Sequence, residues 1–520
     1  MEYIIFQSIL FASAMASGVG YVHMLQLEGY QTDGYFRWMK TRAGEAAFRM
    51  LPVFLSLILI PLAGGWAVWG CSALLLLPPW LRHRKVKKPL ALTSRVVRLL
   101  AALALLFGAS TFLVWLPEGA GRLRLLIPTA LYALLPFWVL VAHFVTLPIQ
   151  KAVNNRYLRD AKRRLASHPS LTVIGVTGSY GKTSVKNILS ALLSVRWNVC
   201  ATPESFNTPM GVVRTVRGAV PGGGGLDATH EMFICEMGAR RKGEIKELCD
   251  IASPKHGIVT AIGPMHLETF GSIETVASTK CELFDALPPD GTAFLCSDDP
   301  MLRERKPANA VTYGLDPAFD PDYRADGIAA DASGTRFTVH TRDGRAQEFT
   351  TALLGAHQVL NLLAGIAVAD TLGAPMNRLP AAVRTIRPVP HRLQLIPGRP
   401  ITYIDDAFNS NPAGAKAALD VLAMLDGLKI LVTPGMVELG PEQDTLNRAF
   451  GVQAAAVCDH VALIGRRQTA PIAEGLSEAG YPGEKLKVYE TLKEATDWVK
   501  TIQGHENIYV LLENDLPDNY

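Results

Sequence analysis

Apolar residues divide the chain into two parts with different patterns. The first part contains long apolar stretches at residues 3–19, 51–81, 99–116 and 125–147. After residue 170, short apolar runs alternate with amphipathic segments, and strands are predicted at residues 171–176, 232–235, 256–261, 401–405, 429–432, 460–464 and 508–512. A helix needs about 20 apolar residues to cross a bilayer, whereas strand and helix patterns in alternation indicate a parallel sheet covered by helices. We therefore predict an N-terminal multi-span α-helical membrane region at residues 1–150, followed by α/β domains.

The number of spans depends on the second apolar stretch. Residues 51–81 carry no charged side chain and are too long for a single membrane helix. A turn at residues 61–65 would divide this stretch into two short spans. We favour this interpretation, which gives about five spans, over a single crossing, which gives about four. The first stretch lacks the basic residues that begin a signal peptide, so an uncleaved span is favoured over a cleaved leader.

Basic side chains set the expected orientation of these spans. Residues 82–98 are rich in Lys and Arg and contain no acidic residue, and residues 151–170 are also basic. Lys and Arg concentrate on the cytoplasmic side of membranes. We therefore expect a multi-pass membrane protein with its N-terminus outside and its large C-terminal part in the cytoplasm. Residues 151–170 form a basic juxtamembrane linker, which can also contact anionic membrane lipid.

Composition adds limits but does not change this picture. The 520 residues suffice for about three domains, and a net charge of +4 gives no reason to expect nucleic acid as a partner. The seven cysteines form no Cys-x-x-Cys pair, which favours a reduced setting over a disulfide framework or a zinc site. The strand pattern pauses near residues 388–399. We predict a central α/β domain at residues 171–390 and a C-terminal Rossmann-like α/β domain at residues 391–520.

The best-defined motif follows the first predicted strand. Residues 173–184 read Val-Ile-Gly-Val-Thr-Gly-Ser-Tyr-Gly-Lys-Thr-Ser and lead into a helix predicted at residues 183–195. Glycines in this position let backbone N–H groups turn toward an anion at the start of a helix. Lys182 can reach the terminal phosphates, and Thr183 can bind Mg²⁺. The motif predicts a P-loop in which ATP contacts Thr177, Gly178, Ser179, Tyr180, Gly181, Lys182, Thr183 and Ser184.

The P-loop departs from the common G-x-x-x-x-G-K-[ST] spacing, because Val176 occupies the position of the first glycine. The variant Thr-Gly-x-x-Gly-Lys-Thr resembles the Mur ligase superfamily. Further blocks that resemble this family are Glu236-Met-Gly, His266-Leu-Glu-Thr-Phe-Gly, Gly355-Ala-His-Gln-Val-Leu-Asn361, His391-Arg392, Asp405-Asp406 and Gly435-Met-Val-Glu-Leu-Gly440. The resemblance extends over residues 171–464.

The resemblance implies a metal site and a set of catalytic residues. Mur ligases bind Mg²⁺ through the glutamate that corresponds to Glu236 and a second metal through the histidine that corresponds to His266. In several members the lysine that corresponds to Lys280 is carbamylated and binds Mg²⁺. With Thr183, these four residues are the expected metal ligands. The expected catalytic residues are Lys182, His266, Lys280 and Arg392.

The resemblance also implies the reaction and its nucleotide contacts. ATP would convert an acceptor carboxylate into an acyl phosphate, which an amine then attacks to form an amide. Beyond the P-loop, ATP would contact Asn361, Arg392, Asp405 and Asn409. The motifs point to the branch that adds D-alanyl-D-alanine to UDP-N-acetylmuramoyl-tripeptide. The expected cofactors are ATP and Mg²⁺, and the expected partners are a peptide-bearing cell-wall precursor and an amino acid or D-alanyl-D-alanine.

Several features depart from the family pattern. Apolar stretches stand in place of the usual domain that binds UDP. His391 replaces a glycine, Phe408 replaces a tyrosine, and an acidic segment after Tyr509 replaces a Lys-Gly-Ser loop. A lipid-linked acceptor is therefore one hypothesis. A membrane-anchored scaffold with reduced activity and, with less support, a transporter ATPase are the alternatives that this sequence leaves open.

Overall fold

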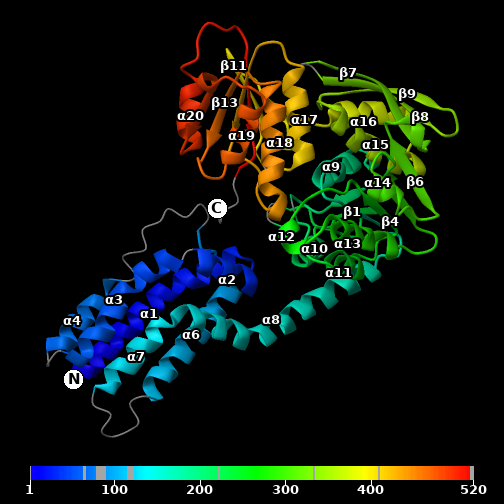
Figure 1. Cartoon of the computed structure of the whole chain (residues 1–520). Helices are drawn as coiled ribbons and strands as arrows, with labels where there is room; N and C mark the ends of the chain where they lie inside the picture. The colour runs from blue at the N-terminus through cyan, green and yellow to red at the C-terminus, as the bar shows by residue number, and fades with distance from the viewer. Residues whose placement is uncertain are drawn as a thin grey trace. The chain divides into compact units, whose positions relative to one another are not determined.

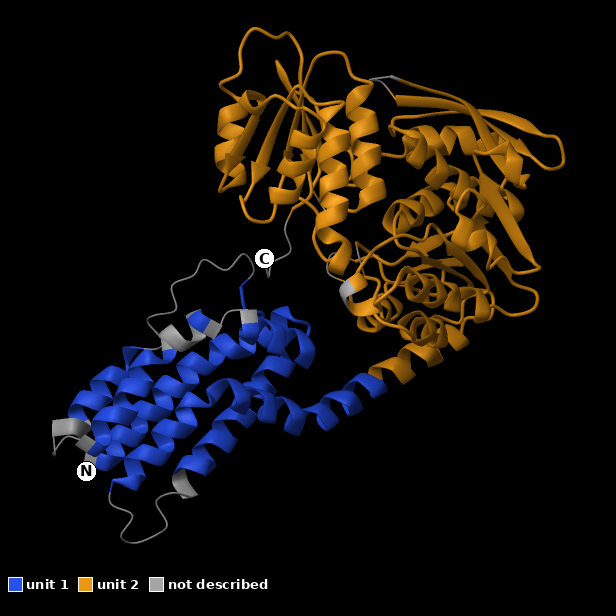
Figure 2. Cartoon of the chain, viewed as in Figure 1, with its two compact units in different colours: residues 1–156, 517–520 blue, residues 157–516 orange. Residues whose placement is uncertain are grey.

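The computed structural model describes residues 2–41, 43–62, 66–77, 89–113, 122–204, 206–220, 223–331, 334–407 and 410–515. The chain forms two compact units, Met1–Arg156 with Pro517–Tyr520, and Tyr157–Leu516 (Figures 1 and 2).

The first unit is helical. Its helices are α1 (Glu2–Leu27), α2 (Thr32–Thr41), α3 (Ala43–Leu62), α4 (Trp66–Leu75), α6 (Ser94–Leu113), α7 (Leu123–Ala133) and the first part of α8 (Leu135–Ala166). Helix α1 packs against α4, α6 and α7, while α3 packs against α4 and α7. By length and composition alone, α1, α6 and α8 can each cross a membrane, and the apolar parts of α3 and α7 are shorter.

Two details of this unit bear on the predicted spans. The long apolar stretch at residues 51–81 does form two helices, α3 and α4, which pack against each other; most of the predicted turn between them lies outside the described residues. The predicted linker at residues 151–170 is helical as far as Ala166, because α8 continues through it.

The second unit contains two sheets, and the first has nine strands in the order β2-β3-β1-β4-β5-β6-β7-β8-β9. Its strands are β1 (Thr172–Thr177), β2 (Val199–Ala201), β3 (Met232–Glu236), β4 (His256–Val259), β5 (Thr292–Cys296), β6 (Ala310–Gly314), β7 (Tyr323–Asp331), β8 (Gly334–Thr341) and β9 (Ala346–Thr351). Strands β1 to β7 pair in parallel, and β7, β8 and β9 pair antiparallel.

Helices cover this sheet. They are α9 (Lys182–Leu193), α10 (Pro209–Val216), α11 (Glu244–Ala252), α12 (Leu267–Phe270), α13 (Ile273–Asp285), α14 (Pro300–Arg303), α15 (Ala356–Thr371) and α16 (Leu379–Thr385), with 3₁₀ turns η1 (Pro317–Phe319) and η2 (Met376–Arg378). Strand β1 lies between β3 and β4, so the loop that follows it opens at the carboxyl end of the parallel strands. In parallel α/β sheets, ligands bind at that edge.

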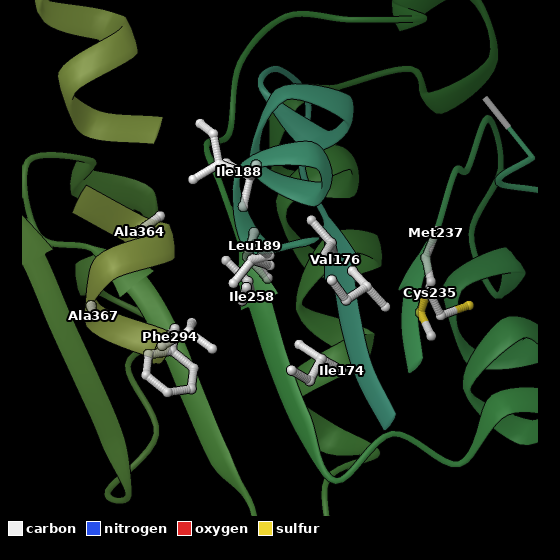
Figure 3. Packing of buried hydrophobic residues seen from close by; sticks show 14 of the residues in the cluster. Ile174, Val176, Ile188, Leu189, Cys235, Met237, Ile258, Phe294, Ala364 and Ala367 are labelled. Atoms are coloured by element: carbon white, nitrogen blue, oxygen red, sulfur yellow. The ribbon is translucent and has the colours of Figure 1, made fainter. Parts of the chain in front are cut away.

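The core under this loop is apolar and closely packed. Ile188 and Leu189 of α9 lie beside Ile174 and Val176 of β1 in one buried cluster (Figure 3). Helix α15 packs directly on α9, and a Cβ added to Gly365 would lie 2.5 Å from Ile188 Cγ2. That distance is shorter than any normal contact, so the glycine permits the two helices to approach and fixes α15 beside the P-loop.

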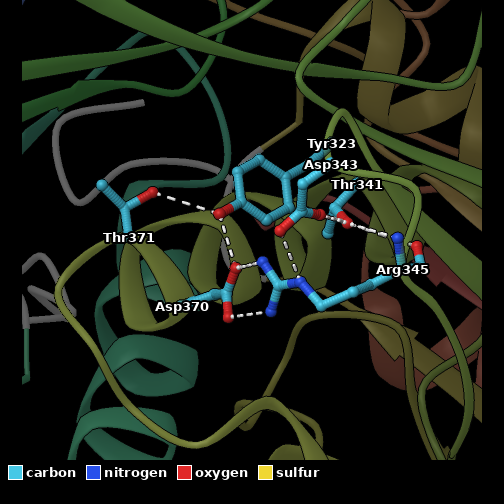
Figure 4. Close-up of polar contacts among 6 residues, drawn as sticks. All are labelled: Tyr323, Thr341, Asp343, Arg345, Asp370 and Thr371. Atoms are coloured by element: carbon cyan, nitrogen blue, oxygen red, sulfur yellow. Dashed lines mark hydrogen bonds and ion pairs between the residues drawn. The ribbon is translucent and has the colours of Figure 1, made fainter.

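Polar contacts hold the far end of α15. Arg345 donates two hydrogen bonds of 2.8 Å to Asp370, and its Nε donates to Asp343 at 2.7 Å (Figure 4). The hydroxyl of Tyr323 donates to the same Asp370 carboxylate at 2.7 Å. Bidentate Arg–carboxylate pairs are stronger and more directional than single bonds. The network therefore joins the antiparallel end of the sheet to α15.

The second sheet has six strands in the order β10-β11-β15-β12-β13-β14. Its strands are β10 (Gln394–Ile396), β11 (Ile401–Asp406), β12 (Leu428–Thr433), β13 (His460–Ile464), β14 (Leu486–Tyr489) and β15 (Ile508–Glu513). Its helices are α17 (Pro412–Ala423), α18 (Gln443–Ala455), α19 (Ala470–Glu478) and α20 (Leu492–Val499), with η3 (Gly440–Glu442) and η4 (Gly483–Lys485). All strands pair in parallel except β10, which is antiparallel to β11.

Candidate functional site

The P-loop adopts a conformation that requires its glycines. Gly178 has φ +142° and Gly181 has φ +76°, both in the region that favours glycine. A Cβ on Gly178 would lie 2.1 Å from Thr260 Oγ1, and a Cβ on Gly181 would lie 2.6 Å from Asn361 Oδ1. Asn361, which was predicted to contact ATP, therefore lies next to the P-loop.

The segment after β4, residues 260–264, holds the P-loop through hydrogen bonds. Ser179 N donates to Ala261 O at 2.7 Å, and its hydroxyl donates to Gly263 O at 3.0 Å. Tyr180 donates its hydroxyl to Pro264 O at 2.9 Å. The side chains of Ser179 and Tyr180, both predicted to contact ATP, therefore hold the loop in shape, and the N–H of Ser179 is already bound to protein.

Lys182 folds back over the loop. Its Nζ donates to Gly178 O at 2.7 Å and to Ser179 O at 3.0 Å. Burial lowers the pKa of Lys182 to about 8, with Glu236 opposing this shift and Arg392 adding to it. Lys182 and Arg392, the two residues predicted to contact the phosphates, are therefore close enough to influence each other electrostatically. A phosphate bound at the loop would replace the two carbonyl oxygens as the hydrogen-bond acceptor of the Lys182 ammonium group.

Glu236 is the centre of the polar contacts next to the loop. Its Oε1 accepts from Thr183 Oγ1 at 3.2 Å and from Asn207 Nδ2 at 3.1 Å, and its Oε2 lies 3.1 Å from Lys186 Nζ. Glu236 and Lys186 are 1% and 2% exposed, so this is a buried ion pair. Sequence reasoning missed Lys186 and Asn207. Lys186 lies one helical turn after Lys182, a spacing that marks the same face of α9.

The residues present fit a magnesium ion bound together with nucleotide. Thr183 and Glu236 bring a hydroxyl and a carboxylate together, and Mg²⁺ is bound by such oxygen ligands with substrate phosphates completing its shell. Within the part of the chain that the structure describes, no group of three or more His, Cys, Asp or Glu side chains could hold a metal by itself. A nucleotide phosphate would have to supply further oxygens.

His266 and Lys280, the other predicted metal ligands, lie near Lys182. The Nδ1 of His266 is 2.7 Å from Glu438 Oε2, and burial lowers the pKa of His266 although Glu438 opposes that shift.

Lys280 is 1% exposed and its Nζ donates to Ala239 O at 3.2 Å. Burial, and next the charge of Lys182, lower the pKa of Lys280 to about 7. A neutral amine is the form that reacts with carbon dioxide, so the environment of Lys280 fits carbamylation.

The start of the C-terminal domain brings Arg392 to the site. Burial lowers the pKa of Arg392, while the charges of Glu236 and Asp406 oppose this shift. Asp405, predicted to contact ATP, is buried and accepts from His391 Nδ1 at 2.7 Å. This pairing was not predicted, because His391 was considered only as a replaced glycine. Asn409 and Phe408 lie outside the described residues.

The acidic segment near residue 513 is partly internal. Glu513 is 1% exposed, accepts from Ser410 Oγ at 2.5 Å and pairs in register with Asp406 on the neighbouring strand. Burial raises the pKa of Asp406 to about 6 and that of Glu513 well above its ordinary range. Two adjacent buried carboxyls share a proton more easily than they both ionise. The charge expected here from the sequence is therefore reduced by burial.

Comparisons with known proteins agree with this geometry. The Mur ligase middle domain matches residues 176–369, and the Mur ligase glutamate ligase domain matches residues 391–512. The UDP-N-acetylmuramoyl-tripeptide–D-alanyl-D-alanine ligase of Mycobacterium tuberculosis is 39% identical over 263 residues, which is 49% of this chain and 49% of that protein. The Escherichia coli protein of the same name is 32% identical over 314 residues, 59% of this chain and 67% of that protein. The chain thus spans about half the length of its mycobacterial relative.

Solved structures show the same likeness. MurF from Acinetobacter baumannii aligns with a TM-score of 0.62 at 25% identity, covering 69% of this chain and 77% of that chain. MurF ligase from Thermotoga maritima in complex with ADP aligns with a TM-score of 0.61 at 25% identity, covering 70% of this chain and 80% of that chain.

Proposed function

This chain belongs to the Mur ligase family, and on that premise we propose that it is an ATP-dependent amide-bond ligase of cell-wall precursor synthesis. It joins D-alanyl-D-alanine to the carboxylate of a muramoyl-tripeptide. The single observation that carries this proposal is the cluster of Lys182, Thr183, Glu236 and Arg392 at the carboxyl end of the first sheet, because it combines an anion-binding loop, a metal-binding carboxylate and a second cation.

The residues of this cluster have separate tasks. ATP, with Mg²⁺, supplies the phosphoryl group that converts the acceptor carboxylate into an acyl phosphate. Lys182 and Arg392 hold the transferred phosphate and offset its charge, and Asn361 and Asp405 help to position the nucleotide. Thr183 and Glu236 would hold one Mg²⁺. Fixed charges of this kind stabilise a transition state because they need no reorganisation during the reaction.

A second metal position would use His266 and Lys280. Addition of carbon dioxide to the neutral amine of Lys280 forms an N–C bond, releases one proton and gives an anionic carbamate. This converts a buried cation, which would repel Mg²⁺, into a ligand that attracts it. The low pKa of about 7 for Lys280 supports this assignment.

Substitution of Lys182 tests the ligase proposal. Lys182→Ala should lower the rate of ATP-dependent ligation by about 10²–10³-fold or more, because the loop loses its phosphate partner. Product formation from ATP, UDP-muramoyl-tripeptide and D-alanyl-D-alanine is measured by mass spectrometry. Lys246→Ala is the matched control, since Lys246 is an exposed lysine of α11. Parental turnover in Lys182→Ala would contradict the proposal.

We further propose that the ligase is held at the bacterial cell membrane with its catalytic domains in the cytoplasm, and that its acceptor is linked to a lipid. The apolar helices α1, α6 and α8 and the basic residues near them support a membrane location. Rates with lipid-linked and UDP-linked tripeptide, compared in vesicles, test the choice of acceptor. Equal rates with the two acceptors would remove the reason for the lipid-linked one.

A further inference from the structure

His266 and Glu438 join the two α/β domains of the second unit. Their side chains meet with a distance of 2.7 Å between Nδ1 and Oε2. Helix α12, which begins directly after His266, also contacts η3, which begins two residues after Glu438. Arg240 Nη2 lies 4.0 Å from the second oxygen of Glu438. The contact therefore brings a residue of the C-terminal domain to a histidine beside the P-loop.

The backbone around Glu438 is fixed. Asn447 accepts from Met436 N at 2.9 Å and donates to Met436 O at 2.9 Å. Asn514 donates to Gly435 O at 2.6 Å. Met436 and Leu439, on either side, are each 2% exposed. A carboxylate on such a segment is presented in one position.

Both partners have unusual backbone conformations. His266 has φ +51° and Glu438 has φ +63°, in the left-handed region of backbone conformation that residues other than glycine rarely adopt. Such conformations persist only where the surrounding structure holds them, and they concentrate at functional sites. Their coincidence at the two ends of one hydrogen bond indicates that this contact has a role beyond packing.

The hydrogen bond also determines the state of the imidazole. An ionised carboxylate accepts hydrogen bonds and does not donate them, so the proton of a neutral His266 must lie on Nδ1. The Nε2 atom then carries a lone pair. A histidine that binds a metal commonly donates its other N–H to a carboxylate in this way.

We propose that Glu438 is a positioning residue that sets the tautomer and orientation of His266, so that the C-terminal domain completes the divalent-cation site beside the P-loop. This inference rests on the proposed function, since it takes His266 as a metal ligand. It makes metal binding depend on the contact between the two domains. A carboxylate in the second domain thereby controls the affinity of a site in the first.

Binding of Mn²⁺ in the presence of ADP tests the proposal without any ligation. Electron paramagnetic resonance measures the concentration of unbound Mn²⁺ in a solution of the full-length protein and ADP. Glu438→Ala should weaken Mn²⁺ binding by about 10–100-fold, the usual effect of removing a carboxylate behind a metal-binding histidine. Glu438→Gln should recover most of the affinity, because its amide oxygen still accepts from Nδ1. Glu442→Gln, an exposed glutamate of the same segment, is the matched control and should behave as the parent.

Two further measurements separate positioning from simple support of the fold. ADP affinity without metal should be unchanged in Glu438→Ala. In a His266→Ala background, Glu438→Ala should have no further effect on Mn²⁺. The proposal is overturned if Glu438→Ala binds Mn²⁺ as the parent does, or if it loses metal-free ADP affinity to the same extent. A parent that binds Mn²⁺ and ADP with this dependence on Glu438 but forms no amide would contradict the ligase proposal and leave this inference standing.

Discussion

At the scale of single residues, Lys182 interacts electrostatically with the other charged groups of the site. After burial, which is the largest cause in each case, Glu236 and Arg392 affect the pKa of Lys182, and the charge of Lys182 lowers the pKa values of His266 and Lys280. The contacts of Glu236 with Lys186 and Asn207 were not predicted. A local motif contains no information about a residue that arrives from a distant segment.

Lys280 allows a prediction about pH. Its pKa is about 7 in the folded protein and 10.5 ordinarily, so between these values the unfolded chain binds a proton that the folded chain does not. Stability from this group therefore rises as the pH increases through that window. Lys280→Met removes the cost of burying the charge. The variant should exceed the parent in thermal stability most at pH 6, and the difference should shrink toward pH 9, in buffer free of carbon dioxide. A difference that is constant with pH would contradict the lowered pKa.

The buried pair of Lys186 and Glu236 allows a prediction about stability. Lys186→Met should destabilise the protein by about 3–5 kcal/mol, because it leaves a buried carboxylate without its cation. The double variant Lys186→Met/Glu236→Gln should lose less, since neither member of the pair is then left as an unpaired buried charge. Urea unfolding measures both. Lys246→Met, which removes an exposed pair with Asp250, should change stability by less than about 1 kcal/mol. This account would be contradicted if the double variant lost as much unfolding free energy as the two single variants lose together.

At the scale of elements, the apolar pattern predicted most strands of the parallel sheets. Residues 171–176, 232–235 and 256–261 correspond to β1, β3 and β4, and residues 508–512 correspond to β15. These strands are buried on both faces and read as continuous apolar runs. The antiparallel strands β7, β8 and β9 were not predicted, because polar residues interrupt them and leave no continuous apolar run. No motif of the family follows these strands either. The helical course of residues 151–166 was also missed, since charged residues there suggested a linker.

The turn from β1 into α9 allows a prediction about the P-loop. Gly178→Ala should abolish ADP binding, because the added Cβ would collide with Thr260 and φ +142° is unfavourable for alanine. Isothermal titration calorimetry measures the affinity. Gly483→Ala is the control, since a Cβ there meets nothing within 4 Å and its φ is not in the left-handed region. Retained affinity in Gly178→Ala would show that the loop rearranges before it binds nucleotide.

At the scale of the whole molecule, the pattern of apolar stretches predicted an N-terminal helical region distinct from the α/β domains, and the structure divides the chain near the same place, at Arg156. The sequence cannot predict which residues of the two α/β domains meet. Leu354, between β9 and α15 of the first domain, lies in the buried cluster of the second, and no pattern in the sequence marks it.

Protease accessibility tests the proposed topology. Added protease should cleave the segment 157–516 in inside-out membrane vesicles and leave it intact in right-side-out vesicles, because the basic loops favour the cytoplasmic side. The full chain should stay with the membrane after washing at alkaline pH. Permeabilised right-side-out vesicles are the control for protease activity. Protection in inside-out vesicles would reverse the orientation, and release by the wash would argue against spans.

The position of β15 affects how the protein is made. This strand comes after every other strand of its sheet in the chain, yet it lies between β11 and β12. Until β15 leaves the ribosome, the β10-β11 pair and the β12-β13-β14 group have open edges, which are prone to wrong pairing. A nascent chain can therefore complete the first sheet and its P-loop while the domain that carries Glu438 is still unformed. Synthesis interrupted before residue 513 would leave a nucleotide-binding fragment without the means to use the nucleotide.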